Sequence, residues 1–269
     1  MDETEFRIVI NSIIDELKSR GVELPPMLKR RDRREPGRLA KESMEDKLTI
    51  AIRRKFKEQY IKIIEYLTMR FPERKDIIKP TDPLDDIFED DDKFTADIIK
   101  LLYVAGRGGV ELFRNSVSIG LDYSLVNDRA LDWAGSYAGE LIKGVNETSK
   151  KLVGNAIQRF ISTPGFTLGD ISSQLNDIFG VERARTIAVT ETTRSYAEGE
   201  RLAGLMMKEE YPDVKVIKTW FTNRDDIVCE ICSAMDGEEV EIDKPFSGGV
   251  DAPPAHVKCR CFLQTGTKI

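Results

Sequence analysis

The chain has 269 residues, of which 33% are charged and 41% hydrophobic, and its formal net charge at pH 7 is −6. A chain of this length can bury one large core or two smaller ones. It contains no run of about 18 apolar residues, which argues against a membrane span. The acidic start, Met1–Glu5, lacks the order of a secretory signal peptide. Because neither a membrane span nor a signal peptide is found, we expect a cytosolic protein without membrane contacts. The negative charge argues against a dedicated nucleic-acid binder.

The N-terminal region is expected to be helical. Residues 5–19 have apolar side chains at helical spacing and predict a short amphipathic helix. The run 29–38 is strongly basic and without periodicity, which favours a solvated linker over a phosphate or acidic-partner contact. Residues 45–70 predict the best helix of this half.

The helix predicted over 45–70 has a pronounced apolar face and a charged remainder. A helix of this length usually packs in a bundle or against another subunit, so we take five residues of the face as candidate partner-binding residues. These are Leu48, Ile52, Phe56, Tyr60 and Ile63. The charged remainder carries Arg53, Arg54, Lys57 and Lys62.

The middle of the chain predicts further helices. The acidic stretch 80–92 is broken by prolines and lacks the spacing and central glycine of a calcium loop, so we expect a surface loop. Between about 93 and 162 helices follow one another, and Gly106–Gly109 is expected to separate the first two. Trp133 and Tyr137 lie on a stripe that is typical of a core-facing helix side.

Two more helices are expected before the C-terminal part. Thr167 and Asp170 have the spacing of a capping box, which predicts a helix that ends at Gly180. The next helix covers about 182–209 and contains Thr190, Glu191 and Arg194. The spacing of the last two indicates no more than a surface ion-pair ladder that continues to Glu198.

After Pro212 the apolar pattern changes to alternation. Residues 214–222, 239–242 and 261–264 predict three short strands. We therefore expect an α+β fold, with a mostly helical N-terminal half and C-terminal helices packed on a small antiparallel sheet that carries a Cys/His cluster.

All four cysteines and the only histidine lie in the last fifty residues: Cys229, Cys232, His256, Cys259 and Cys261. The pattern C-x-x-C, followed by H-x-x-C-x-C, supplies two ligand pairs for a tetrahedral metal site. No H-E-x-x-H motif or nearby general base accompanies it, which favours structural zinc over catalytic zinc. Five candidates for four positions leave either His256 or Cys261 surplus. Reduced cysteines packed in a small core, and a disulfide, are the alternatives.

Two blocks of sequence resemble the phage Mu F-like head-morphogenesis family. The first block is Phe166–Gly180, continued by Arg183–Glu191 and by Thr192, Thr193 and Arg194. The second comprises Trp220–Asp226, Val228–Cys232, Asp236-Gly237, Pro245-Phe246, Asp251–His256 and Cys259–Cys261. The resemblance covers roughly 115–266. It divides the chain into a helical arm or assembly region, 1–110, and a Mu F-like domain, 111–269.

The resemblance implies a minor head protein of a phage or prophage, without enzyme activity, that acts at the portal in head assembly and in DNA packaging or ejection. The implied partners are the portal protein, the major capsid or scaffold protein, and weakly bound DNA. The implied location is the interior of the virion head, and the host cytoplasm during assembly. Val189 departs from the family pattern, in which a polar residue is expected.

Two functions of other classes compete with this interpretation. One is a zinc-stapled DNA-binding module that uses the basic run 29–38. The other is a transferase or hydrolase built on the helix that carries Glu191 and Arg194.

Overall fold

The computed structural model describes residues 35–70, 83–89, 91–118, 120–223 and 228–268. Contacts divide the chain into Met1–Pro36 and Gly37–Ile269, and the second unit is described below. The predicted helix 5–19, most of the basic run 29–38 and the start of the acidic loop lie outside the described residues. Within the described helices, none is long and apolar enough to cross a membrane.

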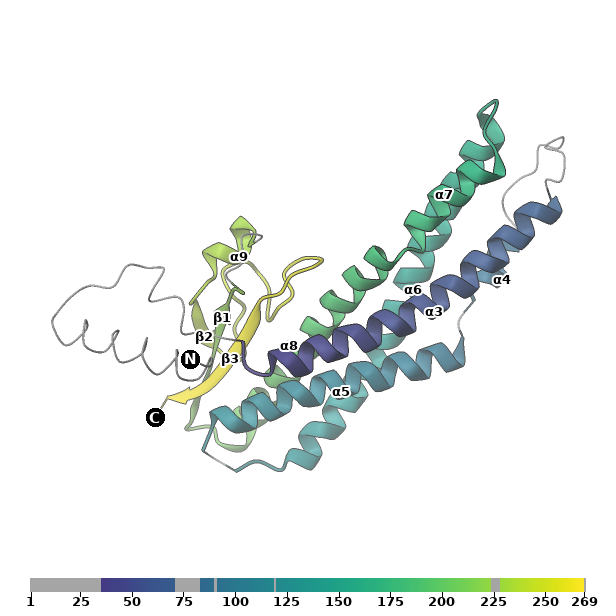
Figure 1. The fold of residues 1–269 in the computed structure, drawn as a ribbon. Coiled ribbons are helices and arrows are strands. Elements are labelled where there is room, and N and C mark those ends of the chain that lie inside the picture. Colours follow the sequence, from purple (N-terminus) through teal and green to yellow (C-terminus); the bar gives the residue numbers. More distant parts are fainter. Residues whose placement is uncertain (1–34, 71–82, 90, 119, 224–227, 269) are drawn as a thin grey trace, which may run out of the picture. The chain divides into compact units, whose positions relative to one another are not determined.

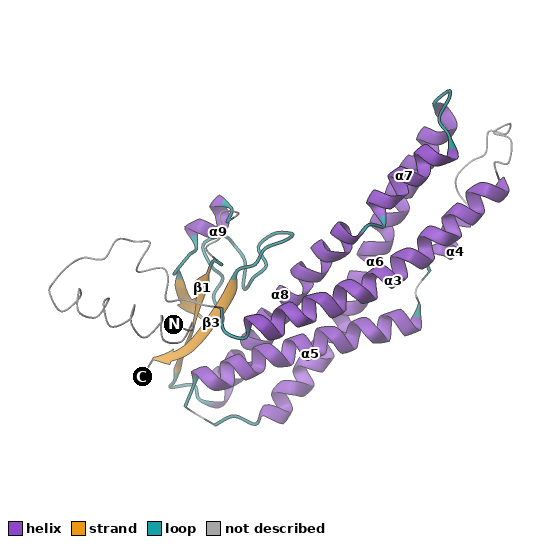
Figure 2. Ribbon diagram, viewed as in Figure 1, coloured by secondary structure: helices purple, strands orange, loops and turns teal. Residues whose placement is uncertain are grey.

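The unit Gly37–Ile269 consists of helices followed by a small sheet, which confirms the predicted α+β class (Figures 1 and 2). The helices are α3 (Arg38–Arg70), α4 (Pro83–Ile87), α5 (Asp92–Ser116), α6 (Tyr123–Ser162), α7 (Leu168–Ile178), α8 (Val181–Glu210) and α9 (Glu230–Ala234). The strands are β1 (Lys215–Phe221), β2 (Glu239–Glu241) and β3 (Phe262–Lys268).

The apolar face of α3 packs inside the chain. Leu48, Ile52, Phe56 and Ile63 are each at most 3% exposed and belong to a core shared with α6, α7 and α8. Tyr60 is half-buried, and its hydroxyl lies 2.7 Å from the hydroxyl oxygen of Ser172 on α7. The candidate partner-binding assignment therefore needs correction, because this face is already covered by the protein's own helices.

Glycines set the distance between α5 and α8. The run Gly106–Gly109 lies inside α5 rather than between two helices, contrary to the prediction. A Cβ atom on Gly109 would lie 1.9 Å from the Tyr196 carbonyl oxygen, and one on Gly199 would lie 1.9 Å from the Gly106 carbonyl oxygen. The two backbones therefore touch at this crossing. The domain boundary expected near residue 110 falls within α5, which packs along α8.

The sheet is antiparallel with the order β2-β1-β3. Its central strand β1 alternates, so that Val216, Lys218 and Trp220 are buried on one face. Val216 packs with Met207 of α8, and Trp220 packs with Cys232 and Phe246. The sheet thus links the helices to the cysteine-bearing loops.

The predicted capping box is present at the start of α7. The Thr167 hydroxyl oxygen accepts from the Asp170 amide at 3.2 Å, and the Asp170 carboxylate accepts from the Thr167 amide at 2.7 Å. These two bonds satisfy amide groups that lack partners within the helix. The helix therefore begins where the sequence predicts.

Lys218 is a fully buried lysine of β1 that the sequence did not single out. Its Nζ donates to the Asp251 carbonyl oxygen at 2.7 Å and lies 5.2 Å from the centre of the Phe246 ring. Burial lowers the pKa of Lys218 to about 8, although the nearby Asp251 carboxylate acts in the opposite direction. Lys218 therefore loses its proton at a lower pH in the folded protein than in the unfolded chain.

This difference predicts a pH-dependent stability. Between the lowered pKa and the ordinary lysine value, the unfolded chain binds more protons than the native protein, so native stability rises with pH. The unfolding free energy of the parent relative to Lys218→Met should rise by about 2 kcal/mol between pH 8 and pH 10.5. Denaturant titrations at several pH values measure it. The matched control is Lys215→Met, because Lys215 is exposed on the same strand. The prediction would be contradicted if the unfolding free energy depended on pH equally in both variants.

Candidate metal centre

Two loops bring the predicted ligands together. Cys229 lies immediately before α9 and caps it, because its Sγ accepts a hydrogen bond from the Cys232 amide at 3.4 Å. Cys232 lies inside the single turn of α9. His256 and Cys259 lie on the opposite loop, and Cys261 immediately precedes β3. Each half of the sequence motif therefore forms one side of the site.

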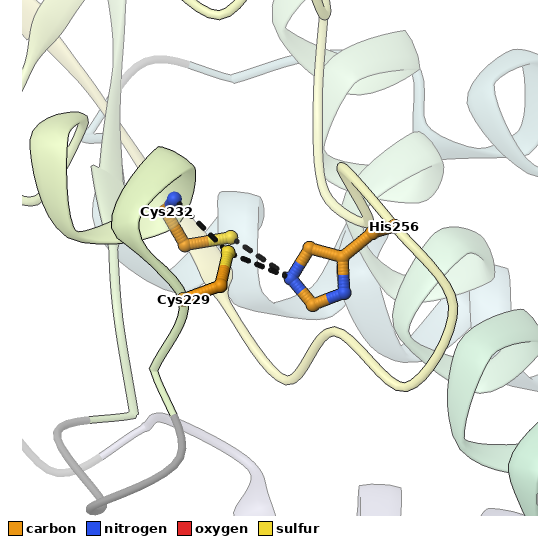
Figure 3. A group of neighbouring side chains, drawn as sticks. All are labelled: Cys229, Cys232 and His256. Carbon is orange, nitrogen blue, oxygen red and sulfur yellow. Dashed lines mark hydrogen bonds between the residues drawn. The ribbon is translucent and has the colours of Figure 1, made fainter.

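The histidine ring points at the C-x-x-C pair (Figure 3). His256 Nε2 lies 3.2 Å from Cys229 Sγ and 3.3 Å from Cys232 Sγ. Its Nδ1 lies 2.8 Å from the Val257 carbonyl oxygen. A carbonyl accepts only, so Nδ1 carries the proton, and Nε2 is left with a lone pair directed between the two sulfurs.

The remaining cysteines continue the cluster from Cys232. Cys232 and Cys259 have their Sγ atoms 3.8 Å apart. The sulfurs of Cys232, Cys259 and Cys261 all lie within 4.8 Å of one another, as do the ligand atoms of Cys229, Cys232 and His256. Cys232 therefore belongs to both groups, and the five predicted residues form one continuous cluster.

The pKa shifts at the cluster differ from one thiol to the next. A hydrogen bond from the Cys261 side chain lowers the pKa of Cys259 to about 5. The same contact, together with burial, raises the pKa of Cys261. Burial also raises the pKa of Cys232. The backbone contact to Val257 raises the pKa of His256.

The donor types, three of the ligand separations and the space suit a metal ion, and zinc provides the comparison. Two thiolates on tetrahedral zinc lie about 3.8 Å apart, and a thiolate and an imidazole nitrogen about 3.6 Å apart, given the usual bond lengths. The observed separations are 3.8 Å for sulfur to sulfur, and 3.2 and 3.3 Å for sulfur to nitrogen. A cavity of about 30 Å³ lies among these residues, also lined by Asn223, Lys258 and Arg260. It is large enough for one ion or water.

A hydrogen bond ties the ligand loop to the motif helix. The Lys258 amide donates to the Thr190 Oγ1 atom at 2.9 Å, and Lys258 has a positive φ of 64°. Thr190 Oγ1 in turn donates to the Thr186 carbonyl oxygen at 2.7 Å. A non-glycine residue with positive φ is uncommon and is held by its surroundings. The motif residue Thr190 therefore positions the loop between His256 and Cys259.

Glu191 and Arg194 do not form the surface ladder expected from their spacing. Glu191 is only 6% exposed, and its Oε2 accepts from the Tyr137 hydroxyl at 2.7 Å and from Arg194 Nε at 3.1 Å. The Arg194 guanidinium also lies over the Tyr137 ring. Burial, reinforced by the Glu191 charge, raises the pKa of Tyr137. Glu198 instead pairs with Arg201, through two contacts of 2.8 Å.

This buried network joins α8 to α6, and it has no partner within the cysteine cluster among the described contacts. The sequence could not have predicted it, because Tyr137 and Glu191 are 54 positions apart. The only signal was the Trp133–Tyr137 stripe, whose rings are stacked at 5.1 Å. The arrangement holds two helices together, and Glu191 is enclosed rather than presented to solvent.

Comparison with known proteins gives one family. Residues 151–264 match the family model described as phage Mu protein F like protein. No curated protein and no solved structure matches the chain. The match begins within α6 and contains α7, α8, the sheet down to Gln264 and all five cluster residues. Residues 151–264 are therefore similar to the phage Mu protein F like family.

Proposed function

We propose that this protein is a minor head protein that binds the portal during head assembly and takes part in DNA packaging or ejection. The observation that supports it most is the family match over residues 151–264. The proposed partners are the portal protein and the major capsid or scaffold protein, with DNA as a weak contact. The proposed location is the host cytoplasm during assembly and then the interior of the virion head.

We further propose that the Cys/His cluster holds one structural zinc ion through Cys229, Cys232, His256 and Cys259. His256 is preferred to Cys261 as a ligand because its Nε2 faces two sulfurs. Cys261, whose sulfur lies within 4.8 Å of those of Cys232 and Cys259, is then left outside the ligand set. With all four positions filled by protein atoms, no open coordination position remains for substrate, which is the arrangement of structural sites.

The two competing functions receive less support. The DNA-binding alternative depends on the run 29–38, most of which lies outside the described residues. The enzyme alternative depends on Glu191 and Arg194, whose functional groups bind each other and Tyr137 in a buried network. A carboxylate enclosed in this way has a clear structural role, which supports our proposal that the domain is not catalytic.

Co-expression with the tagged portal protein of the same phage tests the proposed role. We expect the two proteins to elute together in affinity purification and again in size-exclusion chromatography. The tagged tail-tube protein of that phage serves as a control that should capture nothing. A folded, soluble protein that fails to associate with the portal would contradict the portal assignment, while leaving the family assignment intact.

A further inference from the structure

A groove of about 490 Å³ lies on the helices, away from the cysteine cluster. One wall is α3, which contributes Ile50, Arg53, Arg54 and Lys57. Phe179 and Val181, at the corner between α7 and α8, belong to the facing wall. Phe179 is buried and contacts the Phe56 ring edge-on, with centroids 5.6 Å apart, so the facing wall of the groove is anchored in the core.

The α3 wall belongs to one exposed stripe of the helix, which continues to Ile61, a residue beyond those that line the groove. Ile50, Arg54, Lys57 and Ile61 follow one another at intervals of four, three and four, which places them on one side of a helix. Ile50 is 66% exposed and Ile61 is 44% exposed, and Val181 on the facing wall is 44% exposed. Two isoleucines therefore flank the cations, at opposite ends of the stripe.

The charges of the stripe are only partly neutralised. Arg54 pairs with Asp97 of α5 at 2.5 Å. Arg53 and Lys57 are exposed, and in the described part of the chain neither forms an ion pair. A ligand that enters the groove therefore meets two cations and exposed apolar surface together. The matching chemistry is a segment that offers carboxylates and apolar side chains on the same face.

We propose that this groove docks an acidic amphipathic helix from another head protein. Ile50 and Ile61 are eleven residues apart, about 16 Å along α3, which a partner helix of three turns would span. Apolar side chains of that helix would contact the two isoleucines, and carboxylates between them would face Arg53 and Lys57. Helix-in-groove recognition uses this arrangement of anchors.

The surroundings favour a peptide over nucleic acid. Asp177 and Glu182 are exposed and directly follow Asn176 and Val181, which line the facing wall. A DNA backbone carries closely and regularly spaced phosphates, so some of them would approach these carboxylates. A helix carries a few carboxylates at chosen positions and avoids that repulsion. The exposed isoleucines also have no apolar counterpart on a phosphate backbone.

The inference rests on the proposed function only for the source of the helix. The chemistry of the groove can be tested without any phage protein. The probe is a fluorescein-labelled helical peptide of 15 residues. It has leucine at positions 1, 4, 8, 11 and 15, and glutamate at the positions next to these leucines. A peptide with glutamine in place of glutamate is the charge control, and a 20-base-pair DNA duplex is the competitor. Fluorescence anisotropy with the whole chain measures binding.

The acidic peptide should bind at least about ten-fold more tightly than its glutamine counterpart, and added salt should narrow that difference. Arg53→Glu with Lys57→Glu should weaken binding at least about ten-fold, and so should Ile50→Ser with Ile61→Ser. The matched controls, Lys143→Glu with Lys151→Glu and Leu131→Ser on α6, alter exposed residues elsewhere and should bind like the parent.

Three outcomes would overturn the inference. Equal binding of the two peptides would remove the acidic requirement. Displacement of the peptide by the duplex at lower concentration would identify a nucleic-acid surface. A dimer that is lost in the same groove variants would assign the surface to a second copy. Portal association is measured separately, so its failure can be distinguished from failure of the groove.

Discussion

Replacing Gly109 with alanine should destabilise the protein by about 3 kcal/mol or more. The new methyl carbon would lie 1.9 Å from the Tyr196 carbonyl oxygen and 2.8 Å from its carbonyl carbon. Both belong to the backbone of α8, so no side-chain rotation relieves the overlap. The helices α5 and α8 would have to move apart, and the core between them would lose contacts. Gly199→Ala should act alike, because its Cβ would meet the Gly106 carbonyl oxygen.

The control for this prediction lies on α6. A Cβ atom on Gly144 would meet nothing within 4 Å outside its own helix. Alanine there should stabilise the protein by about 0.5 to 1 kcal/mol, because glycine is the poorer helix former. Urea denaturation followed by circular dichroism measures both changes. If Gly109→Ala and Gly144→Ala shifted the midpoint in the same direction, close contact between α5 and α8 would be excluded.

Removal of zinc should have the second large effect. A ligand that binds only the native protein, at a concentration a thousand times its Kd, stabilises it by about 4 kcal/mol. The protein purified without a histidine tag should contain one zinc ion per chain by elemental analysis. A strong chelator should then lower the melting temperature, and Cys232→Ser should remove the metal. We choose Cys232 because its sulfur is shared by both ligand groups.

Cys261→Ser separates metal binding from packing. Cys261 is buried in the same cluster, so its replacement should lower stability by polar burial and lost contacts. It should nevertheless leave the zinc content near one per chain, because it lies outside the proposed ligand set. If the chain carries well under one metal ion and its melting temperature does not change in chelator, the cluster consists of packed thiols without a metal. If Cys261→Ser loses its zinc, the fourth ligand is Cys261 and not His256.

Much of the candidate site was predictable because it is encoded locally. The two ligand pairs, the capping box at Thr167 and the alternation of β1 depend on residues a few positions apart. Local spacing fixes which side chains share a turn or a face. The helix around Phe56 was likewise predictable from its apolar period, although it begins at Arg38 and not at residue 45 as the sequence predicts.

Other features depend on contacts between distant residues. The glycines of α5 looked like a break between helices, because their role is visible only when Tyr196 of α8 lies against Gly109. Glu191 looked like part of a surface ladder, because its burial depends on Tyr137 of α6. The face of α3 looked available to a partner for the same reason, since a sequence shows an apolar face but not what covers it.

The sequence by itself determined the α+β class, the similarity of residues 151–264 to the Mu F-like family and the five residues of the cluster. Tertiary structure alone decided that His256 Nε2 faces Cys229 and Cys232, that Lys218 is buried, and that Ile50 with Arg53 and Lys57 lines an open groove. The physical reason is that spacing along the chain fixes the direction of side chains within one element. Burial, the tautomer of an imidazole and the pKa of an amine depend on atoms that another element brings near.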